Sequence, residues 1–428
     1  MSLTRDLVRL IRAKPISDED RRHAALFTLD AVANALAGRK SEPGRLLRLW
    51  AATQGEDAGR EALLIGGLIH ILETDDLHRA SVVHPGCVVV PAVLAIGRRQ
   101  GQGGRALLDA VLHGFEACCR VGMAVGPAHY RVWHNTATCG PYGSAMAAVT
   151  LMELDEDQAV HALGNAGTQS GGLWEFLDTG AMSKHLHAGR AAEAGVVAAE
   201  LASYGFTGAP AILEGGRGFF AGACPDSDPT RVLADPDARW QVHETSIKPW
   251  PSCRHTHPTI DAALEIHAEL NGASIEHIDV ATYAAALDVC DRPLPASVYE
   301  AKFSLYHCVA VALADGAVDF DSFDEAARER LAPLCGRTKV AADEPFVSAY
   351  PAAWGARVSV TATDGREITV ERAACKGDPE RALDSTAMEE KAQRLLAFAG
   401  MEEAEARSVI DGILGLADIG FLPDLEFI

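Results

Sequence analysis

Apolar residues in the first half of the chain recur at the three- and four-residue spacing of amphipathic helices. The segment 20–37 has this pattern, and the segment 105–123 repeats it with Leu107, Leu108, Val111, Leu112 and Phe115 on one stripe. Three further segments, 142–153, 156–165 and 188–204, are rich in Ala, Gly and Leu. Small residues let helices approach closely. We therefore expect a mainly α protein with a large all-α domain over residues 1–247.

The pattern changes after the proline-containing stretch 248–251. A helix is predicted over 258–270, and 277–284 alternates like a strand. The segment 356–371 predicts a hairpin, because apolar residues alternate on both sides of Asp364-Gly365, which suits a type I′ turn. A smaller α+β lid domain is therefore expected over 248–375. Thr386 and Glu389 have the spacing of a capping box, and residues 376–428 are expected to complete the helical domain.

The composition is that of a folded globular protein, with 428 residues, 48% hydrophobic and 23% charged. No apolar stretch reaches the roughly 18 residues of a membrane span. The first 22 residues lack a signal-peptide core, which predicts a cytoplasmic protein. The ten cysteines form no CxxC pair, so we expect them to be buried and reduced.

A formal net charge of −21 argues against nucleic acid and anionic membrane surfaces as partners. An anionic substrate would depend on local cations. HExxH, GxSxG and Walker motifs are absent from the sequence. We therefore expect no nucleotide, no metal and no other cofactor.

Candidate chemistry is concentrated in five histidine-bearing segments rich in turn-forming residues: 73–86, 133–140, 182–190, 252–258 and 302–307. Taken singly, each has a structural explanation. A histidine before proline can fill a loop, Asp75-Asp76 can cap a helix, and Lys184 can lie on a solvated face. Metal binding by Asp75, Asp76 and the histidines is disfavoured, because no two of these residues have the i, i+4 spacing of helical ligands.

Together the segments resemble the MmgE/PrpD family of 2-methylcitrate dehydratases, cis-aconitate decarboxylases and iminodisuccinate epimerases. The resemblance runs nearly end to end. It rests on DD-x-H…HPG at 75–86, WHNTATCGPYG at 133–143, GTQSGGL at 167–173, MSKHLHAGRAAEAG at 182–195, GFTGAPAILEGGRGF at 205–219, KPWPSCRHTHPTIDAALE at 248–265 and AKFSL at 301–305.

The resemblance implies a helical domain, an α+β lid and an active site in the cleft between them, usually in a homodimer. It assigns catalytic roles to His84, His134, Lys184 and His257, and places Asp75 and Asp76 in the family's aspartate-rich turn. Three positions depart from the family pattern. Leu77 replaces a threonine, His307 replaces a tyrosine, and Tyr142 replaces a common phenylalanine. We assign Tyr142 as a further catalytic residue and His307 as a substrate-binding residue.

The residue types suit removal of a proton next to a carboxylate. This step needs a positioned base and cations for the developing negative charge. Histidines can exchange the proton, whereas Lys184 and Arg254 can hold carboxylates. Asp75, Asp76, Arg254 and His307 are predicted to bind substrate.

The prediction is a cofactor-independent dehydratase of a citrate-like polycarboxylate. The alternatives are an epimerase of an aminodicarboxylate such as iminodisuccinate and a cis-aconitate-type decarboxylase. A non-catalytic homologue is disfavoured because all three histidines and Lys184 are present.

Overall fold

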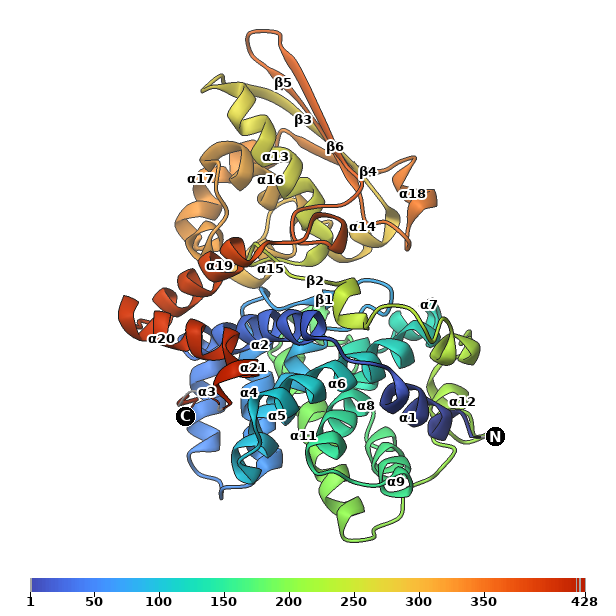
Figure 1. The fold of residues 1–428 in the computed structure, drawn as a ribbon. Helices are drawn as coiled ribbons and strands as arrows, with labels where there is room; N and C mark the ends of the chain where they lie inside the picture. The colour runs from blue at the N-terminus through green and yellow to red at the C-terminus, as the bar shows by residue number, and fades with distance from the viewer. Residues whose placement is uncertain (1, 421, 423–424, 428) are drawn as a thin grey trace. The chain divides into compact units, whose positions relative to one another are not determined.

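The computed structural model describes residues 2–420, 422 and 425–427. The chain divides into two compact units (Figure 1). The first comprises residues 1–247 with 384–428, and the second comprises residues 248–383. The first division falls at the position predicted from sequence. The second lies after residue 383 rather than after residue 375.

The first unit is helical, which confirms the prediction of a mainly α protein with a smaller α+β part. Its longer helices are α1 (Leu3–Ala13), α2 (Asp18–Gly38), α3 (Glu42–Ala51), α4 (Ala58–His70), α5 (Gly86–Gln100), α6 (Gly104–Ala124), α8 (Asn135–Leu151), α9 (Glu156–Gly167), α11 (Ser183–Ser203), α19 (Ser385–Phe398) and α20 (Glu403–Leu414). Short helices α7 (Pro127–Tyr130), α10 (Phe176–Thr179), α12 (Phe219–Ala223) and α21 (Leu416–Ile419) lie among them. Two short strands, β1 (Leu77–His78) and β2 (Thr245–Ser246), pair antiparallel.

Small residues bring the central helices of this unit together. A side chain at Gly195 of α11 would collide with Ser144 and Ala145 of α8, and one at Gly189 would collide with the carbonyl of Leu63 in α4. Helix backbones can approach this closely only where the contact residues are small. The predicted small-residue core thus explains why α4, α8 and α11 pack side by side.

Two helices of this unit begin earlier than the sequence analysis predicted. Helix α8 starts at Asn135 and α11 at Ser183. The segments 133–140 and 182–190, interpreted as turn-rich, therefore lie largely on the first turns of buried helices. Burial of the Ala- and Gly-rich faces outweighs the weak helix propensity of the Asn, Thr, Ser and His residues.

Helix α19 follows the second unit in sequence and packs against α2. The ammonium of buried Lys391 contacts Asp30 of α2 and donates a hydrogen bond to the carbonyl of Thr74 at 2.6 Å. The cap of α19 is Asp384, whose carboxylate accepts from the backbone N–H of Ala387 at 2.8 Å. The predicted capping box at Thr386 is therefore wrong by two residues.

The second unit combines helices with a four-stranded sheet. Its helices are α13 (His257–Leu270), α14 (Ala284–Cys290), α15 (Val298–Lys302), α16 (Leu305–Asp315), α17 (Glu325–Cys335) and α18 (Phe346–Ala349). Its strands are β3 (Ile275–Thr282), β4 (Thr338–Ala342), β5 (Ala356–Ala362) and β6 (Glu367–Arg372), in the order β4-β3-β5-β6. Strands β3 and β4 are parallel and the other pairs are antiparallel.

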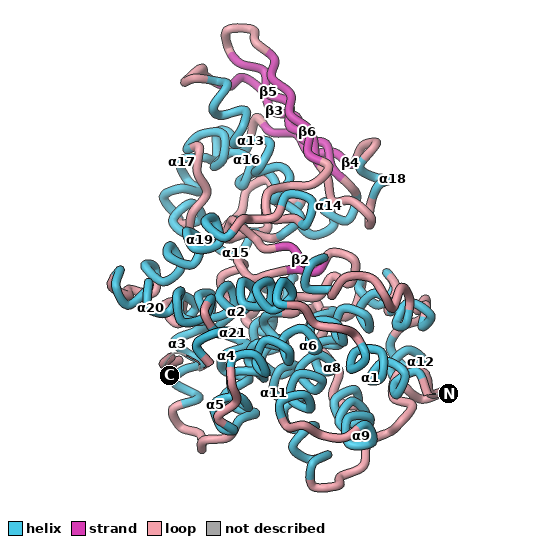
Figure 2. Tube along the Cα trace, in the orientation of Figure 1, coloured by secondary structure: helices cyan, strands magenta, loops and turns pink. Residues whose placement is uncertain are grey.

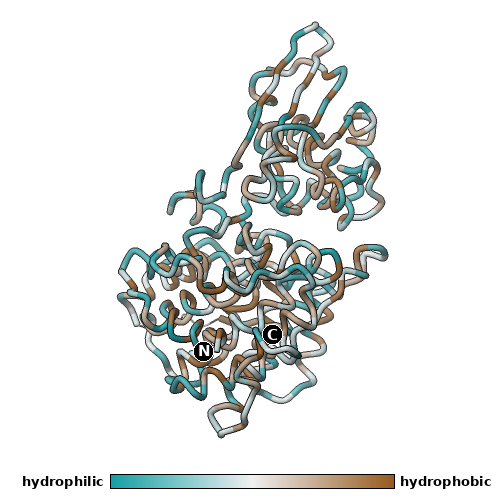
Figure 3. Tube along the Cα trace, turned by 90° about the vertical axis from the view of Figure 1, so that its right-hand side faces the viewer, coloured by the Kyte–Doolittle hydropathy of each residue, from teal (hydrophilic) through white to brown (hydrophobic). Residues whose placement is uncertain are grey.

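One face of this sheet carries the core of the second unit. Residues of β5 alternate between buried and half-buried, with Val358 and Val360 inside. Figure 3 shows the alternation of hydrophobic and hydrophilic residues along the long strands. Helices α13 and α16 lie on one side of the strands (Figure 2) and belong to the same cluster of buried residues as these valines.

The predicted hairpin is present but its turn differs. Thr361 pairs with Glu367, and the backbone N–H of Ala362 donates to the carbonyl of Arg366 at 2.9 Å. The loop therefore has three residues, 363–365, with Gly365 at φ 85°. A type I′ turn needs positive φ at both Asp364 and Gly365, and Asp364 does not have it.

All ten cysteines lie among the described residues and are buried, and they form no disulfide, as predicted. Within the described ranges, no helix combines the length and the apolar character needed to cross a bilayer.

Candidate active site

Four imidazoles gather in the first unit, brought together by helix ends. His70 ends α4, His84 lies just before α5, His134 precedes the first residue of α8, and His187 lies in the second turn of α11. Ring centroids are 4.7 Å apart for His70 and His84, 5.6 Å for His70 and His134, and 5.6 Å for His134 and His187. The structure thus brings the predicted residues His84 and His134 into one cluster.

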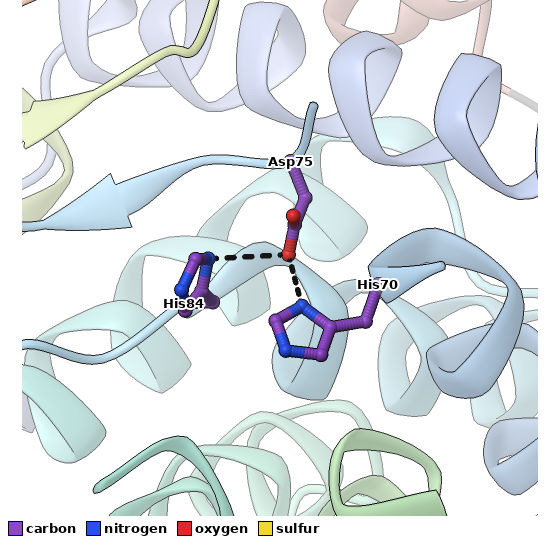
Figure 4. A group of neighbouring side chains, drawn as sticks. All are labelled: His70, Asp75 and His84. Carbon is purple, nitrogen blue, oxygen red and sulfur yellow. Dashed lines mark hydrogen bonds and ion pairs between the residues drawn. The ribbon is translucent and has the colours of Figure 1, made fainter. Parts of the chain in front are cut away.

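The carboxylate of Asp75 lies between two of these rings (Figure 4). Its Oδ2 is 2.6 Å from Nδ1 of His70 and 3.3 Å from Nδ1 of His84. The His70 and Asp75 side chains are 0% and 1% exposed, whereas that of His84 is 12% exposed. Of these three groups, His84 is the one that a small molecule can reach most easily.

The neighbouring Asp76 has a different task. Both of its carboxylate oxygens accept from the backbone N–H of Gly86, at 3.0 and 2.9 Å. This N–H belongs to the first residue of α5, so Asp76 caps that helix from ten positions away. Burial, and then the charges of Asp75 and Asp30, raise the pKa of Asp76 well above its usual range. The helix-capping alternative is the one that fits Asp76.

Lys184 is paired with Glu73 in the interior. The ammonium contacts a carboxylate oxygen of Glu73, and both side chains are buried. Glu73 has φ 61°, a left-handed conformation that is uncommon for residues other than glycine. The interpretation of Lys184 as a residue on a solvated face is therefore wrong.

His134 and His187, the other two histidines of the cluster, are kept neutral by burial and by nearby charges. Burial, and then the charges of His70 and Lys184, lower the pKa of His134 well below its usual range and that of His187 to about 4. Their Nδ1 atoms are 3.4 Å apart, and Trp174 packs on His134 with ring centroids 4.7 Å apart. Lys184 and His187 lie three positions apart on α11, which places both side chains on one face of that helix.

Tyr142 lies elsewhere in α8, and its neighbours differ from those of the imidazoles. Its ring contacts Phe219 with centroids 5.6 Å apart. A side chain at Gly167 would collide with the phenol oxygen, so glycine there makes room for it. Burial raises the pKa of Tyr142 well above its usual value. The predicted acid–base role of Tyr142 stays a prediction.

The remaining predicted residues belong to the second unit. His257 begins α13 and is fully buried, with Nε2 3.3 Å from the carbonyl of Ser252. Burial, and then the charges of Arg254 and Lys248, lower its pKa well below the usual range. That His257 shares a cavity with the first-unit histidines stays a prediction.

Arg254 and His307 both contact groups of their own unit. A guanidinium nitrogen of Arg254 is 2.6 Å from a carboxylate oxygen of Asp378, and both side chains are buried. Nε2 of His307 is 2.8 Å from the carbonyl of Ser322, and its ring packs on Phe323. These contacts occupy most of the polar atoms that the substrate-binding assignments would use. Nη1 of Arg254 and Nδ1 of His307 have no hydrogen-bond partner within the described residues.

One donor set could hold a metal ion. The ligand atoms of His70, Asp75 and His84 lie within 4.8 Å of one another. Two ligands of one tetrahedral zinc ion are separated by roughly 3.4 Å, whereas Nδ1 of His70 and Oδ2 of Asp75 are 2.6 Å apart. This separation is that of a hydrogen bond, so the arrangement favours a proton-sharing network over a metal centre.

Comparison with known proteins identifies the family. The model of the MmgE/PrpD N-terminal domain matches residues 5–232, and that of the C-terminal domain matches residues 250–415. The chain belongs to the MmgE/PrpD family. The resemblance seen in the sequence is thereby confirmed.

Several curated proteins are similar to this member of the MmgE/PrpD family. A cis-aconitate decarboxylase of Aspergillus terreus is 27% identical over 390 residues, 83% of this chain and 78% of the relative. A cis-aconitate decarboxylase-like protein, oryM, of Aspergillus oryzae is 32% identical over 203 residues, 44% of this chain and 42% of the relative. The Homo sapiens cis-aconitate decarboxylase is 26% identical over 346 residues, 77% and 71% of the two chains.

The sequence analysis assigned no role to three residues of this candidate site. His70 lies outside the five histidine-bearing segments, whereas Glu73 and His187 lie within them. His70 interrupts the apolar run LLIGGLIHIL, and Glu73 follows one turn later. His187 lies three positions after Lys184, which places both on one face of a helix. That segment was interpreted as turn-rich, so the helical spacing was not used.

Five buried or half-buried histidines predict that stability falls in mild acid. Burial lowers the pKa of His23, His78, His113 and His187 to about 4 and that of His255 to about 3. The unfolded chain, with pKa values near 6.5, binds more protons below that pH, so this stabilisation is complete above pH 6.5 and is lost towards pH 4. The raised pKa values of the carboxyls of Asp76, Glu193 and Glu200 act in the opposite sense, but the five imidazoles outnumber these three carboxyls.

We therefore expect the melting temperature to fall steadily between pH 6.5 and 5, before carboxylates of ordinary pKa titrate. Thermal melts across this range, with pH 7 to 8 as the flat reference, measure the effect. A constant melting temperature from pH 6.5 to 5 would contradict the lowered pKa values of these histidines.

Proposed function

We propose that this protein is a lyase acting on a small polycarboxylate, and that decarboxylation of cis-aconitate or a similar unsaturated tricarboxylate is its first candidate reaction. The observation that carries the proposal is the imidazole cluster around Asp75, with the ammonium of Lys184 beside it. The curated relatives named cis-aconitate decarboxylases supply the candidate reaction.

The proposed decarboxylation requires one bond cleavage and one proton. The bond between the allylic carbon and its carboxylate breaks, and carbon dioxide leaves. The released electron pair forms a new double bond with the central carbon. The pair of the former double bond moves onto the next carbon, where the adjacent carboxylate spreads the charge, and that carbon then takes a proton.

The residues of the first unit suit these tasks. An ammonium close to the histidines stabilises the negative charge that develops next to the remaining carboxylate. His84, with Asp75 behind its Nδ1, can carry the proton on Nε2, because the carboxylate stabilises an imidazolium. His134 and His187 stay neutral and can therefore donate or accept a hydrogen bond without adding charge.

Dehydration of a citrate-like polycarboxylate and epimerisation of an aminodicarboxylate stay predictions. Both begin with loss of a proton next to a carboxylate, which neutral His84 can accept. The same groups can serve all three reactions, so only analysis of the products distinguishes decarboxylation, dehydration and epimerisation.

The test is product analysis by proton NMR in heavy water, with cis-aconitate, citrate, 2-methylcitrate and iminodisuccinate as separate substrates. We expect cis-aconitate to lose one carboxylate and to incorporate one deuteron, in the presence of EDTA as well as without it. His84→Gln should reduce the rate at least a hundredfold, whereas His113→Gln, away from the cluster, should not.

Turnover of citrate or 2-methylcitrate to an alkene, with cis-aconitate unchanged, would replace the decarboxylase by the dehydratase. Activity lost on chelation and restored by a divalent ion would show that His70, Asp75 and His84 bind a metal. No turnover and no deuterium exchange with any of these compounds would reject the proposal.

A further inference from the structure

A buried histidine, His70, contacts the aspartate of the Asp75–His84 pair. His70 presents Nδ1 to Oδ2 of Asp75 at 2.6 Å, and the same oxygen lies 3.3 Å from Nδ1 of His84. The order His70, Asp75, His84 therefore runs from a side chain that is 0% exposed to one that is 12% exposed. A substrate cannot touch His70 directly, so any effect of His70 on catalysis has to pass through Asp75.

The hydrogen-bonding role of His70 follows from its surroundings. Its Nε2 is buried and has no hydrogen-bond partner within the described residues. A proton on this nitrogen would be buried without an acceptor, which is costly. Nδ1 is therefore the nitrogen that donates to the carboxylate of Asp75. A hydrogen bond donated to a carboxylate stabilises its negative charge.

Other charged groups surround this network. Glu73 pairs with Lys184, and Asp30 pairs with Lys391. Asp76, capping α5, adds a carboxyl whose pKa the charge of Asp75 raises. His134 stacks on His70 at 5.6 Å. With two carboxyls adjacent in sequence, a dedicated donor decides which of them stays ionised, and His70 provides it to Asp75.

We propose that His70 is a positioning residue. Its Nδ1–H fixes the Asp75 carboxylate, which in turn holds the imidazole of His84 with Nδ1 inward and Nε2 available for proton transfer. The inference rests on the proposed function for its kinetic consequences, because His84 is the proton-transfer group there. The hydrogen-bond arrangement itself can be observed without turnover.

Two substitutions of His70 separate hydrogen bonding from packing. His70→Asn keeps an N–H at the position of Nδ1, whereas His70→Phe keeps the volume of the ring but removes the donor. We expect His70→Phe to lower kcat about ten- to a hundredfold with little change of KM, since His70 is out of reach of substrate. His70→Asn should stay within about threefold of the original enzyme. His113→Phe, which replaces a histidine bonded to Thr150 elsewhere in the unit, controls for loss of a histidine ring.

The pH profile gives a readout that a purely structural role would not move. Without the donor, the Asp75–His84 pair binds a proton more tightly, because a hydrogen bond to the charged carboxylate has been lost. The acidic limb of kcat/KM should move to higher pH in His70→Phe and stay in place in His70→Asn. In a background of Asp75→Asn, His70→Phe should have little further effect, since the two substitutions break one network.

Nitrogen NMR of the imidazoles tests the arrangement even if no substrate is found. With the His84 signals assigned by difference from His84→Gln, we expect His84 to carry its proton on Nδ1 in the original protein and in His70→Asn. A mixture of tautomers is expected in His70→Phe. Equal losses of kcat in both His70 variants with an unmoved pH limb, or an unchanged tautomer of His84 in His70→Phe, would overturn the proposal. Absence of turnover in the original protein would count against the proposed function alone.

Discussion

Lys184→Met is expected to lower kcat/KM about a hundredfold or more and to destabilise the first unit at the same time. The loss of activity follows if the ammonium stabilises charge that develops in the transition state. The loss of stability follows from Glu73, whose buried carboxylate loses its cationic partner. Breaking a buried ion pair on one side costs about 3–5 kcal/mol. Steady-state kinetics on the accepted substrate and a thermal melt measure the two effects.

The double variant Glu73→Gln with Lys184→Met separates these effects. Removing both charges should restore most of the lost melting temperature, because no charge stays buried alone. Activity should not return. Recovery of activity in the double variant would mean that Lys184 serves only to neutralise Glu73. A rise of KM with constant kcat would instead assign Lys184 to anchoring a substrate carboxylate.

Arg254→Met is expected to be among the most destabilising changes in the second unit. The guanidinium is bonded to both carboxylate oxygens of Asp378, which is fully buried and also accepts from the backbone N–H of Cys375 at 2.9 Å. Removing the cation leaves that carboxylate buried without it, again at a cost of about 3–5 kcal/mol. Arg330→Met, which breaks the more exposed pair with Asp315, should change the melting temperature little.

The double variant Arg254→Met with Asp378→Asn tests whether Arg254 also binds substrate. Its stability should largely recover. If the role of Arg254 is structural, activity recovers with it. Nη1 lacks a hydrogen-bond partner within the described residues. If it holds a substrate carboxylate, the double variant recovers its stability but has a higher KM than the original enzyme. Kinetics of the double variant beside its thermal melt decide between the two roles.

The predicted site residues were found because their segments are long and specific, but their partners were not. His84, His134 and Lys184 were selected from the sequence. The structure places both histidines in one imidazole cluster and Lys184 on α11, three positions before His187 of that cluster. The sequence analysis assigned Asp75 and Asp76 the same role, substrate binding, although their contacts differ. Asp75 contacts two histidines, whereas Asp76 caps α5. Neighbours along the chain point in different directions, and the pattern of residue types contains no information about that direction.

The sequence by itself determined the fold class and the positions of most elements. Helical periodicity, small residues and the alternation over 356–362 are local properties of the sequence. Burial of one face of a helix or strand produces a periodic pattern of apolar residues, and this pattern predicts the element. Helix starts and the hairpin turn were less accurate, because they depend on a single capping contact, as with Asp384, or on one φ angle, as with Gly365.

Only the tertiary structure decided which charges are neutralised. Glu73 and Lys184 are 111 positions apart, and Arg254 and Asp378 are 124 apart. No spacing rule links residues so distant in sequence. The packing of each unit brings the two partners together. Each buried charge then needs its partner, because a single charge in the low dielectric of the interior costs far more free energy than a matched pair.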